Sequence, residues 1–256
     1  MSRAVVARPG LSSRVRVAAF FRMLLLQGSW NYRTMLGSGF AFALLPALRE
    51  LTSGDREALE EALGRHVEHF NAHPYLASVA VGAVLRMEAD GEDAATIRKL
   101  KVALRGPLGS LGDALIWATV LPGAALASLA LLWIGVAPWI AVGVFLLVFN
   151  AVHLGVRAWG FRAGLRSGRD VGRVLMVANL SRLTRRLQPA VVVLLGLFTG
   201  AVIGGDDGLV EAGPLWLGLA AAAFLAGLLG GHRTWRPAAA GTVAAIGVLA
   251  LMGVIS

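Results

Sequence analysis

The sequence predicts an all-α integral membrane protein, and its composition and the spacing of its charges carry this prediction. Of its 256 residues, 57% are hydrophobic and only 15% are charged, whereas soluble domains are about a quarter charged. The hydrophobic residues form long blocks without Asp, Glu, Lys or Arg, which cover residues 114–156, 187–205, 212–232 and 237–256. A helix that spans a bilayer needs roughly 20 apolar residues, so each block can supply one span and the first can supply two.

The C-terminal half, residues 114–256, is expected to hold about five transmembrane helices. They fit best at residues 115–134, 138–156, 189–205, 212–231 and 237–255. Between the second and third spans, residues 157–186 contain eight Arg opposed only by Asp170. Because loops rich in Arg and Lys stay on the cytoplasmic side, we expect a basic cytoplasmic loop at 157–186. The link 206–211 has no basic residue and is expected to face outward.

Glycines recur at every fourth position in two parts of this half. They are Gly160, Gly164, Gly168 and Gly172 in the first part, and Gly196, Gly200 and Gly204 in the second. Small residues at this spacing form a flat helix face that another helix can approach closely in lipid. The spacing therefore predicts sites of helix packing, and it predicts no chemistry.

The N-terminal half, residues 1–113, is expected to combine cytoplasmic or interfacial helices with re-entrant or broken ones. Its Arg-rich beginning predicts an N-terminus on the cytoplasmic side. The apolar runs at 34–48 and 71–85 are interrupted by Gly and Pro. Runs of about 15 residues are too short to span a bilayer comfortably, so both are candidates for re-entrant segments.

Two amphipathic helices are expected within this half, over residues 55–70 and 93–104. Their apolar residues recur at helical spacing, and the second helix is expected to end at the Gly-Pro pair that follows it. That pair and two later glycines are interpreted as a re-entrant hinge before Asp113. The alternative interpretation is an ordinary turn in which Asp113 caps the next helix. The hinge residues are Gly106, Pro107, Gly109 and Gly112.

Seven polar residues lie in or beside the short apolar runs, where they cannot be explained as solvated loop residues. Burying such groups costs several kcal/mol unless they are paired, so they usually face a cavity, a substrate or another subunit. Transporters also place their binding sites at interrupted helices. We therefore predict that these residues bind a substrate or line its path: Asn71, His73, Asp113, Gln27, Asn31, Glu68 and Glu88.

Several other functions are not supported by the residue pattern. The net charge of +9 comes mainly from Arg residues that flank apolar blocks, so no nucleic-acid surface is predicted. The chain has no Cys. His66, His69 and His73 have a spacing that resembles a metal site, but Pro74 takes His73 out of helical geometry, and neither a metal nor a cofactor is expected. No nucleophile elbow, phosphate loop or zinc-protease motif occurs, so an enzyme is not expected.

Short motifs in a fixed order resemble one known family. Residues 27–33 (QGSWNYR) with Gly39-Phe40 are similar to its Q…WNYE-R-M…GF segment, and residues 65–75 (RHVEHFNAHPY) to its R-H-x-x-F-F-N-T-H-P-Y segment. Met87-Glu88 is similar to its ME pair, residues 104–113 (LRGPLGSLGD) to its L-M-G-P-L-A-G-I-G-D segment, and Asn150 with residues 160–164 to its N…GYxxG pattern. The sequence thus resembles the IID component of the mannose/fructose/sorbose phosphotransferase system over about residues 20–168.

This resemblance implies a non-catalytic permease subunit in the bacterial plasma (inner) membrane. Such a subunit carries hexoses of the mannose type inward together with a IIC membrane subunit. Phosphorylation of the sugar, driven by phosphoenolpyruvate, is implied to occur on a separate soluble IIAB protein. The resemblance also implies a trimer of IIC–IID pairs, surrounded by lipid, with re-entrant hairpins around the sugar path.

The sequence departs from the family pattern within these motifs. His69 stands where the pattern has Phe, Ala72 where it has Thr, and Arg105 where it has Met, and residues 109–111 replace A-G-I. The link after Gly168 is also shorter than the family's. These departures leave the sugar open, and they leave two alternatives: a self-sufficient small-molecule carrier, or a degenerate permease subunit with a regulatory role.

Overall fold

The computed structural model describes residues 10–204 of the chain, and almost all regular structure in this part is helical. Isolated β-bridges join Met35 to Asn31 and to Phe70. Residues 10–204 contain no β-strand beyond these bridges. The two expected spans at 212–231 and 237–255, and the link 206–211, lie outside the described residues. The helices are α1 (Ser13–Leu24), α2 (Gly37–Thr52), α3 (Arg56–Val67), α4 (Ala77–Asp90), α5 (Ala94–Gly112), the π-helical η1 (Asp113–Val120), α6 (Leu121–Trp133), α7 (Pro138–Ser167), the 3₁₀ turn η2 (Gly168–Asp170), α8 (Val171–Ala178) and α9 (Leu180–Gly204).

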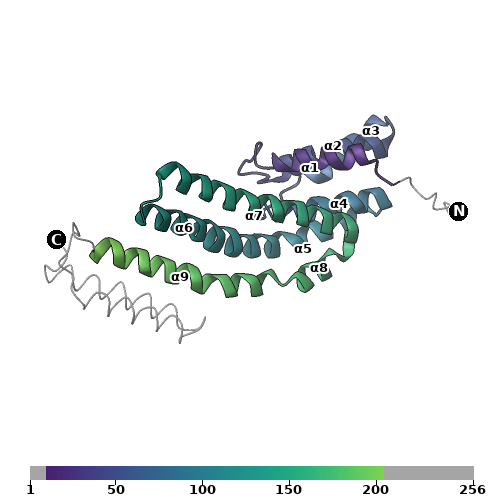
Figure 1. The fold of residues 1–256 in the computed structure, drawn as a ribbon. Coiled ribbons are helices and arrows are strands. Elements are labelled where there is room, and N and C mark those ends of the chain that lie inside the picture. Colours follow the sequence, from purple (N-terminus) through teal and green to yellow (C-terminus); the bar gives the residue numbers. More distant parts are fainter. Residues whose placement is uncertain (1–9, 205–256) are drawn as a thin grey trace. The chain divides into compact units, whose positions relative to one another are not determined.

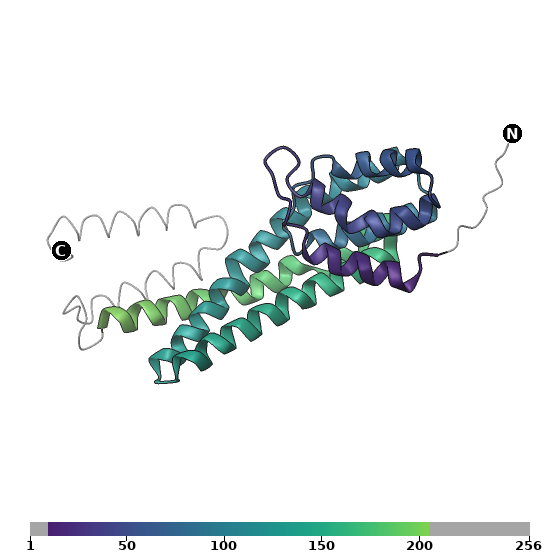
Figure 2. The ribbon, with the colours of Figure 1, turned by 90° about the horizontal axis from the view of Figure 1, so that it is seen from above.

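The chain divides into two compact units, and the first unit is discontinuous in sequence. Among the described residues, it combines residues 10–118 with Val148–Leu183, while the second combines Thr119–Leu147 with residues 184–204. In the first unit, α2 contacts α1, α3 and α4 (Figure 1), and Figure 2 shows these helices from above. In the second unit, α6 and the beginning of α7 form a hairpin in which the Ser128 hydroxyl donates to the carbonyl of Ala141 at 2.7 Å.

Two helical stretches, Ala94–Trp133 and Pro138–Gly196, are long and apolar enough to cross a membrane by length and composition. Only 22% and 6% of the residues in their most apolar windows are buried. The core helix of a soluble protein would be mostly buried, because water strongly disfavours exposed apolar surface. Lipid accounts for this exposure, in agreement with the membrane protein that the composition predicts.

The amphipathic helices expected at 55–70 and 93–104 are confirmed as α3 and as the first part of α5. Each begins at an aspartate whose carboxylate accepts a backbone N–H, from Ala58 to Asp55 at 3.0 Å and from Thr96 to Asp93 at 2.9 Å. Such N-caps satisfy a helix N–H that has no partner within the helix. The helical spacing of apolar residues located both helices correctly, and the structure adds an aspartate N-cap to each.

The predicted end of the second helix at Gly106 and Pro107 is wrong. Helix α5 continues through both residues to Gly112, and a π-helical segment and then α6 follow without a break. Proline removes one helical hydrogen bond. Leu104 and Leu108, on either side of it, are both buried in the core of the first unit. We attribute the survival of the helix to this packing, which offsets the lost bond.

Helix α4 is the centre of the first unit. Twelve of its 14 residues are buried, on all sides of the helix. A helix that is apolar all round must be enclosed by other helices. The surrounding core includes Phe40 of α2, Ile97 of α5 and Phe161 of α7. At about 1.5 Å per residue, α4 is about 21 Å long, shorter than the hydrocarbon core of a bilayer.

Glycines allow α7 to approach α4 closely, as their four-residue spacing predicts. A Cβ atom on Gly164 would overlap the carbonyl oxygen of Val79, and one on Gly82 of α4 would overlap the carbonyl oxygen of Phe161. A Cβ atom on Gly160 would overlap the hydroxyl oxygen of Ser78. The prediction of a packing face is therefore confirmed for Gly160 and Gly164. Gly172, in contrast, has open space where its Cβ would lie.

A buried ion-pair cluster joins α3 to α4. Glu88 accepts hydrogen bonds from the guanidinium of Arg65 at 2.9 and 2.8 Å, and lies 2.8 Å from Nε2 of His66. Burial opposes the charge of Glu88, but the bonds from His66 and Arg65 outweigh it and lower the pKa of Glu88 to about 2. Burial also lowers the pKa of His66, more than its bond to Glu88 raises it. A neutral His66 donating to an ionised Glu88 is therefore the resting state.

Substituting Gly164 by Ala should destabilise the protein, although alanine is ordinarily the better helix residue. The added methyl group would overlap the backbone of α4, and overpacking of this kind typically costs about 1–3 kcal/mol. Gly155 on the same helix is the matched control, because nothing lies within 4 Å of its Cβ position. Gly155→Ala should be neutral or stabilising by up to about 1 kcal/mol. Equal melting temperatures of the two variants in detergent would contradict the close packing of α4 on α7.

Substituting Glu88 by Gln should destabilise the protein by about 3 kcal/mol at neutral pH, because it leaves Arg65 buried without its charge partner. Glu88 has a lowered pKa, so its contribution is complete above pH 4.5 and is lost as the pH falls toward 2. Because burial lowers the pKa of His66, the protein also loses stability as the pH falls below 6.5. The difference in melting temperature between wild type and variant should therefore shrink below pH 4.5.

Glu68→Gln provides the control for that measurement. Glu68 pairs with Arg98 at 2.7 Å, but both side chains are nearly half exposed. Exposed pairs of this kind contribute less than about 1 kcal/mol. If Glu68→Gln lowered the melting temperature as much as Glu88→Gln, burial would not be the reason for the stability of the Glu88 cluster.

Candidate functional site

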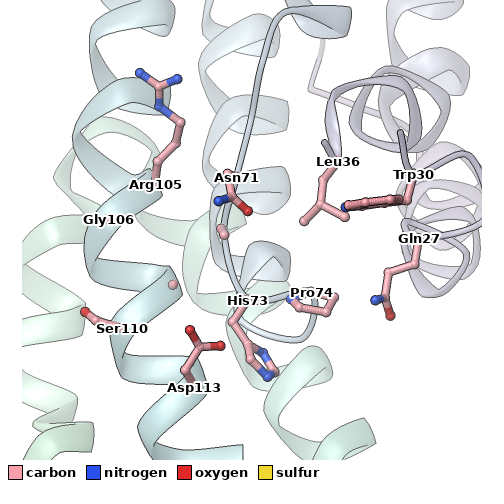
Figure 3. Close-up of a pocket in the computed structure, with 12 residues that line it drawn as sticks. Gln27, Trp30, Leu36, Asn71, His73, Pro74, Arg105, Gly106, Ser110 and Asp113 are labelled. Atoms are coloured by element: carbon pink, nitrogen blue, oxygen red, sulfur yellow. The ribbon is translucent and has the colours of Figure 1, made fainter. Parts of the chain in front are cut away.

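A pocket of about 490 Å³ opens in the first unit between two loops and α5 (Figure 3). One loop follows α1, and the other connects α3 to α4. Most of its lining side chains carry hydrogen-bonding groups, which distinguishes it from an apolar packing gap. The lining residues are Gln27, Trp30, Leu36, Asn71, Ala72, His73, Pro74, Arg105, Gly106, Gly109, Ser110 and Asp113.

Backbone hydrogen bonds hold the two loops together beside the pocket. The N–H of Leu36 donates to the carbonyl of Phe70 at 3.0 Å, and the N–H of Phe70 donates to the carbonyl of Thr34 at 3.1 Å. Asn31 fixes the first loop internally, because its Oδ1 accepts the N–H of Thr34 at 2.9 Å while its Nδ2 donates to the Thr34 hydroxyl at 2.8 Å. Asparagine commonly closes turns in this way. The pairing fixes the position of Asn71, the next residue after Phe70.

His73 packs directly onto α5. Its ring occupies the place where a side chain at Gly112 would lie, so only glycine permits this contact. Nδ1 accepts the N–H of Tyr75 at 3.2 Å, so the proton of the neutral ring lies on Nε2. Within the described part of the chain, that buried Nε2 has no hydrogen-bond partner. An unpaired buried donor costs about 1–3 kcal/mol, and an oxygen supplied by a ligand would remove that cost.

Aromatic rings and one arginine surround Tyr75, which follows this part of the pocket wall. The ring of Tyr75 stacks on His153 with centroids 4.7 Å apart and contacts Trp117 at 5.8 Å. The guanidinium of Arg157 lies over the same ring, 4.6 Å from its centroid. Arg157 also donates to the carbonyl of Leu24 at 2.8 Å. This bond satisfies one of the carbonyls that the end of α1 leaves free.

The pocket brings together four of the seven predicted site residues: Gln27, Asn71, His73 and Asp113. The other three lie outside its lining. Asn31 holds the loop that presents Trp30, Glu68 forms an exposed ion pair with Arg98, and Glu88 is buried in the ion-pair cluster. Of the predicted hinge residues, Gly106 and Gly109 line the pocket, Gly112 lies beneath His73, and Pro107 is not part of the lining.

The sequence reasoning did not assign Trp30, Arg105 or Ser110 to the site. All three stand within the motifs at 27–33 and 104–113, but only the fold brings their side chains to one pocket. Arg105 donates from Nη1 to the carbonyl of His69 at 3.2 Å and lies 3.0 Å from its Nδ1. Residues 10–204 contain no cluster of three or more His, Cys, Asp or Glu that could hold a metal ion.

The chemistry of this pocket suits a small ligand with many hydroxyl groups. Amide, hydroxyl, carboxylate and guanidinium groups provide both donors and acceptors, and Trp30 provides an apolar ring surface. The volume falls within the range of about 300–1,000 Å³ that is typical of small-molecule sites. The arrangement therefore fits the binding of a small polar ligand.

Comparison with solved structures gives two similar membrane proteins. A chain from the structure of the mannose transporter ManYZ in complex with microcin E492 matches with a TM-score of 0.59 at 26% identity, covering 96% of this chain and 97% of that chain. A chain from a structure described only as a membrane protein matches with a TM-score of 0.68 at 26% identity and the same coverage. These matches agree with a helical membrane protein.

Comparison with characterised proteins gives relatives from several bacteria. The chain is 35% identical to the mannose-specific EIID component of Escherichia coli K12, 30% identical to the fructose permease IID component of Bacillus subtilis 168, and 34% identical to the sorbose-specific EIID component of Klebsiella pneumoniae. The alignments cover 72%, 75% and 73% of this chain. The chain spans 65%, 70% and 67% of the lengths of these relatives.

A family model extends this similarity over most of the described residues. The model of the PTS system mannose/fructose/sorbose family IID component matches residues 10–205. That range includes every helix described above and every residue of the pocket. The motifs that suggested the family are therefore not isolated resemblances, and the chain belongs to the PTS mannose/fructose/sorbose family of IID components.

Proposed function

We propose that this protein is a permease subunit that carries hexoses of the mannose type across the plasma membrane of a bacterium. The observation that supports this most directly is the pocket, because it gathers Gln27, Asn71, His73 and Asp113 in a chain whose relatives are named for mannose, fructose and sorbose. Each of these groups can bond a sugar hydroxyl. The role is transport without catalysis by this chain.

The proposed partners are a IIC membrane subunit and a soluble IIAB protein. The ManYZ transporter, which the chain resembles, supports a membrane partner. Exposed apolar surface along the long helices, such as Trp139 at 76% and Leu147 at 71% exposure, supports contact with lipid or a second membrane subunit. Phosphorylation driven by phosphoenolpyruvate would then take place on the IIAB protein, and the whole assembly would be a trimer of IIC–IID pairs.

In the proposed membrane arrangement, the N-terminus and the basic residues 157–186 face the cytoplasm. The helices from residue 114 onward supply about five spans, and residues 1–113 form interfacial helices and re-entrant segments. The shortness of α4 and its enclosure by other helices support a re-entrant role, because a segment that does not span must be surrounded by protein. The glycines at 106, 109 and 112 would let the loop that carries His73 shift against α5.

The test is phosphoenolpyruvate-dependent hexose uptake in a host without its own mannose permease. The chain is co-expressed with IIC-like and IIAB-like proteins encoded beside it, and omitted in the control. Asn71→Ala should lower the apparent affinity for the sugar about 2- to 10-fold, and Asp113→Asn about 10-fold or more, because bonds to charged groups are stronger. Both variants should reach the membrane at the normal level.

Glu68→Gln is the matched control for these variants, because Glu68 lies outside the pocket lining and pairs at the surface. It should transport normally. Uptake that does not depend on this chain, although the chain forms a stable complex with the IIC-like protein, would contradict the transport role. That result would favour the regulatory alternative, and transport by the purified chain alone would favour a self-sufficient carrier.

A further inference from the structure

Two departures from the family pattern, His69 and Arg105, meet in space although 36 residues separate them. The guanidinium of Arg105 lies 3.0 Å from Nδ1 of His69 and donates to the His69 carbonyl at 3.2 Å. The two residues form a polar pair whose members contact each other, and one of them lines the pocket.

Arg105 has no carboxylate within 4 Å in the described part of the chain. The neighbouring arginines of this region are paired, Arg65 with Glu88 and Arg98 with Glu68. A guanidinium has five N–H donors, and His69 engages only one nitrogen of Arg105. The other N–H groups of the Arg105 guanidinium remain able to donate, and its positive charge has no carboxylate beside it. A guanidinium in this situation can bind an anionic group.

The position of this charge within the pocket indicates the shape of the ligand. Figure 3 shows Arg105 at one end of the pocket, Asp113 and His73 at the other, and Asn71 between them. Arg105 and Asp113 are eight residues apart on one continuous helix, about 12 Å along its axis. This spacing along the helix places the two charged side chains at separate ends of the pocket, with room for a ligand between them.

We propose that the pocket prefers a sugar acid, a hexose whose terminal carbon is a carboxylate, over the neutral hexose. The carboxylate would lie against Arg105, and the ring hydroxyls would bond Asn71, His73 and Asp113. Asp113, at the far end, would repel a carboxylate and so fix the direction in which the ligand enters. This inference rests on the proposed function, because it names the substrate class of the same pocket.

An alternative explanation for Arg105 is that it belongs to a solvated basic ridge of α5 together with Arg98. The structure favours the ligand, because His69 restrains the Arg105 side chain at the pocket wall, whereas Arg98 is exposed and lies outside the lining. If a basic ridge attracted the anion, the preference for the anion would depend on the number of positive charges on α5. A ligand contact would depend on Arg105 alone, and this difference decides the design of the test.

The test measures glucuronate and glucose binding to the purified complex of this chain with its IIC partner, by calorimetry, beside hexose uptake in cells. Wild type should bind glucuronate at least about 10-fold more tightly than glucose, as a charge-assisted bond implies. Arg105→Met should abolish this preference, because it should weaken glucuronate binding at least about 10-fold and far more than it weakens glucose binding. His69→Phe should reduce the preference partly, because it releases Arg105 without removing its charge.

Arg98→Met is the matched control, since it removes the same charge from the same helix outside the pocket lining. It should leave the preference intact. Equal binding of glucuronate and glucose by wild type, or an equal loss in the Arg98 and Arg105 variants, would overturn the inference. Hexose uptake without a preference for glucuronate leaves the transport role standing, whereas glucuronate binding without any uptake removes the transport role and leaves the binding site.

Discussion

The close contact between α4 and α7 is the constraint on which the first unit depends. Helix α4 is buried on all sides, and it can be enclosed so tightly only because Gly82, Gly160 and Gly164 let two backbones touch. Everything that forms the pocket is then fixed relative to α4. The loop before it carries Asn71 and His73, and α5, which lines the pocket, contacts it directly.

Some polar groups in this unit are paired within the protein and others line the pocket, and this difference separates a role in stability from a role in binding. Glu88 and Arg65 neutralise each other inside the protein, so their charges stabilise the junction of α3 and α4. Asn31 is fully engaged in its own turn. His73 and Arg105 differ from these, because each keeps hydrogen-bonding capacity that the described residues do not use. Unused capacity beside a pocket is what a ligand can satisfy.

Local patterns in the sequence predicted the local features of the fold. The spacing of apolar residues located α3 and the first part of α5, and the spacing of Gly160 and Gly164 located a packing face. Asn71 and His73, which were predicted from polar residues in short apolar runs, line the pocket, and their role in binding a substrate stays a prediction. Contacts between distant residues could not be predicted, because neither partner carries a local sign of the other. Arg105 with His69 is one example, and the helix through Pro107, held by packing of Leu104 and Leu108, is another.

The bond from Arg157 to Leu24 has a consequence for the order of events during synthesis. The two residues are 133 positions apart, and the first unit is interrupted by the hairpin of Thr119–Leu147. The ribosome therefore delivers the N-terminal helices long before the residues that complete their core. Until α7 emerges, Arg157 cannot bond the carbonyl of Leu24 at the end of α1, and α4 lacks the helix that packs against Gly82. The apolar hairpin is therefore synthesised before the unit that it interrupts can close around the pocket.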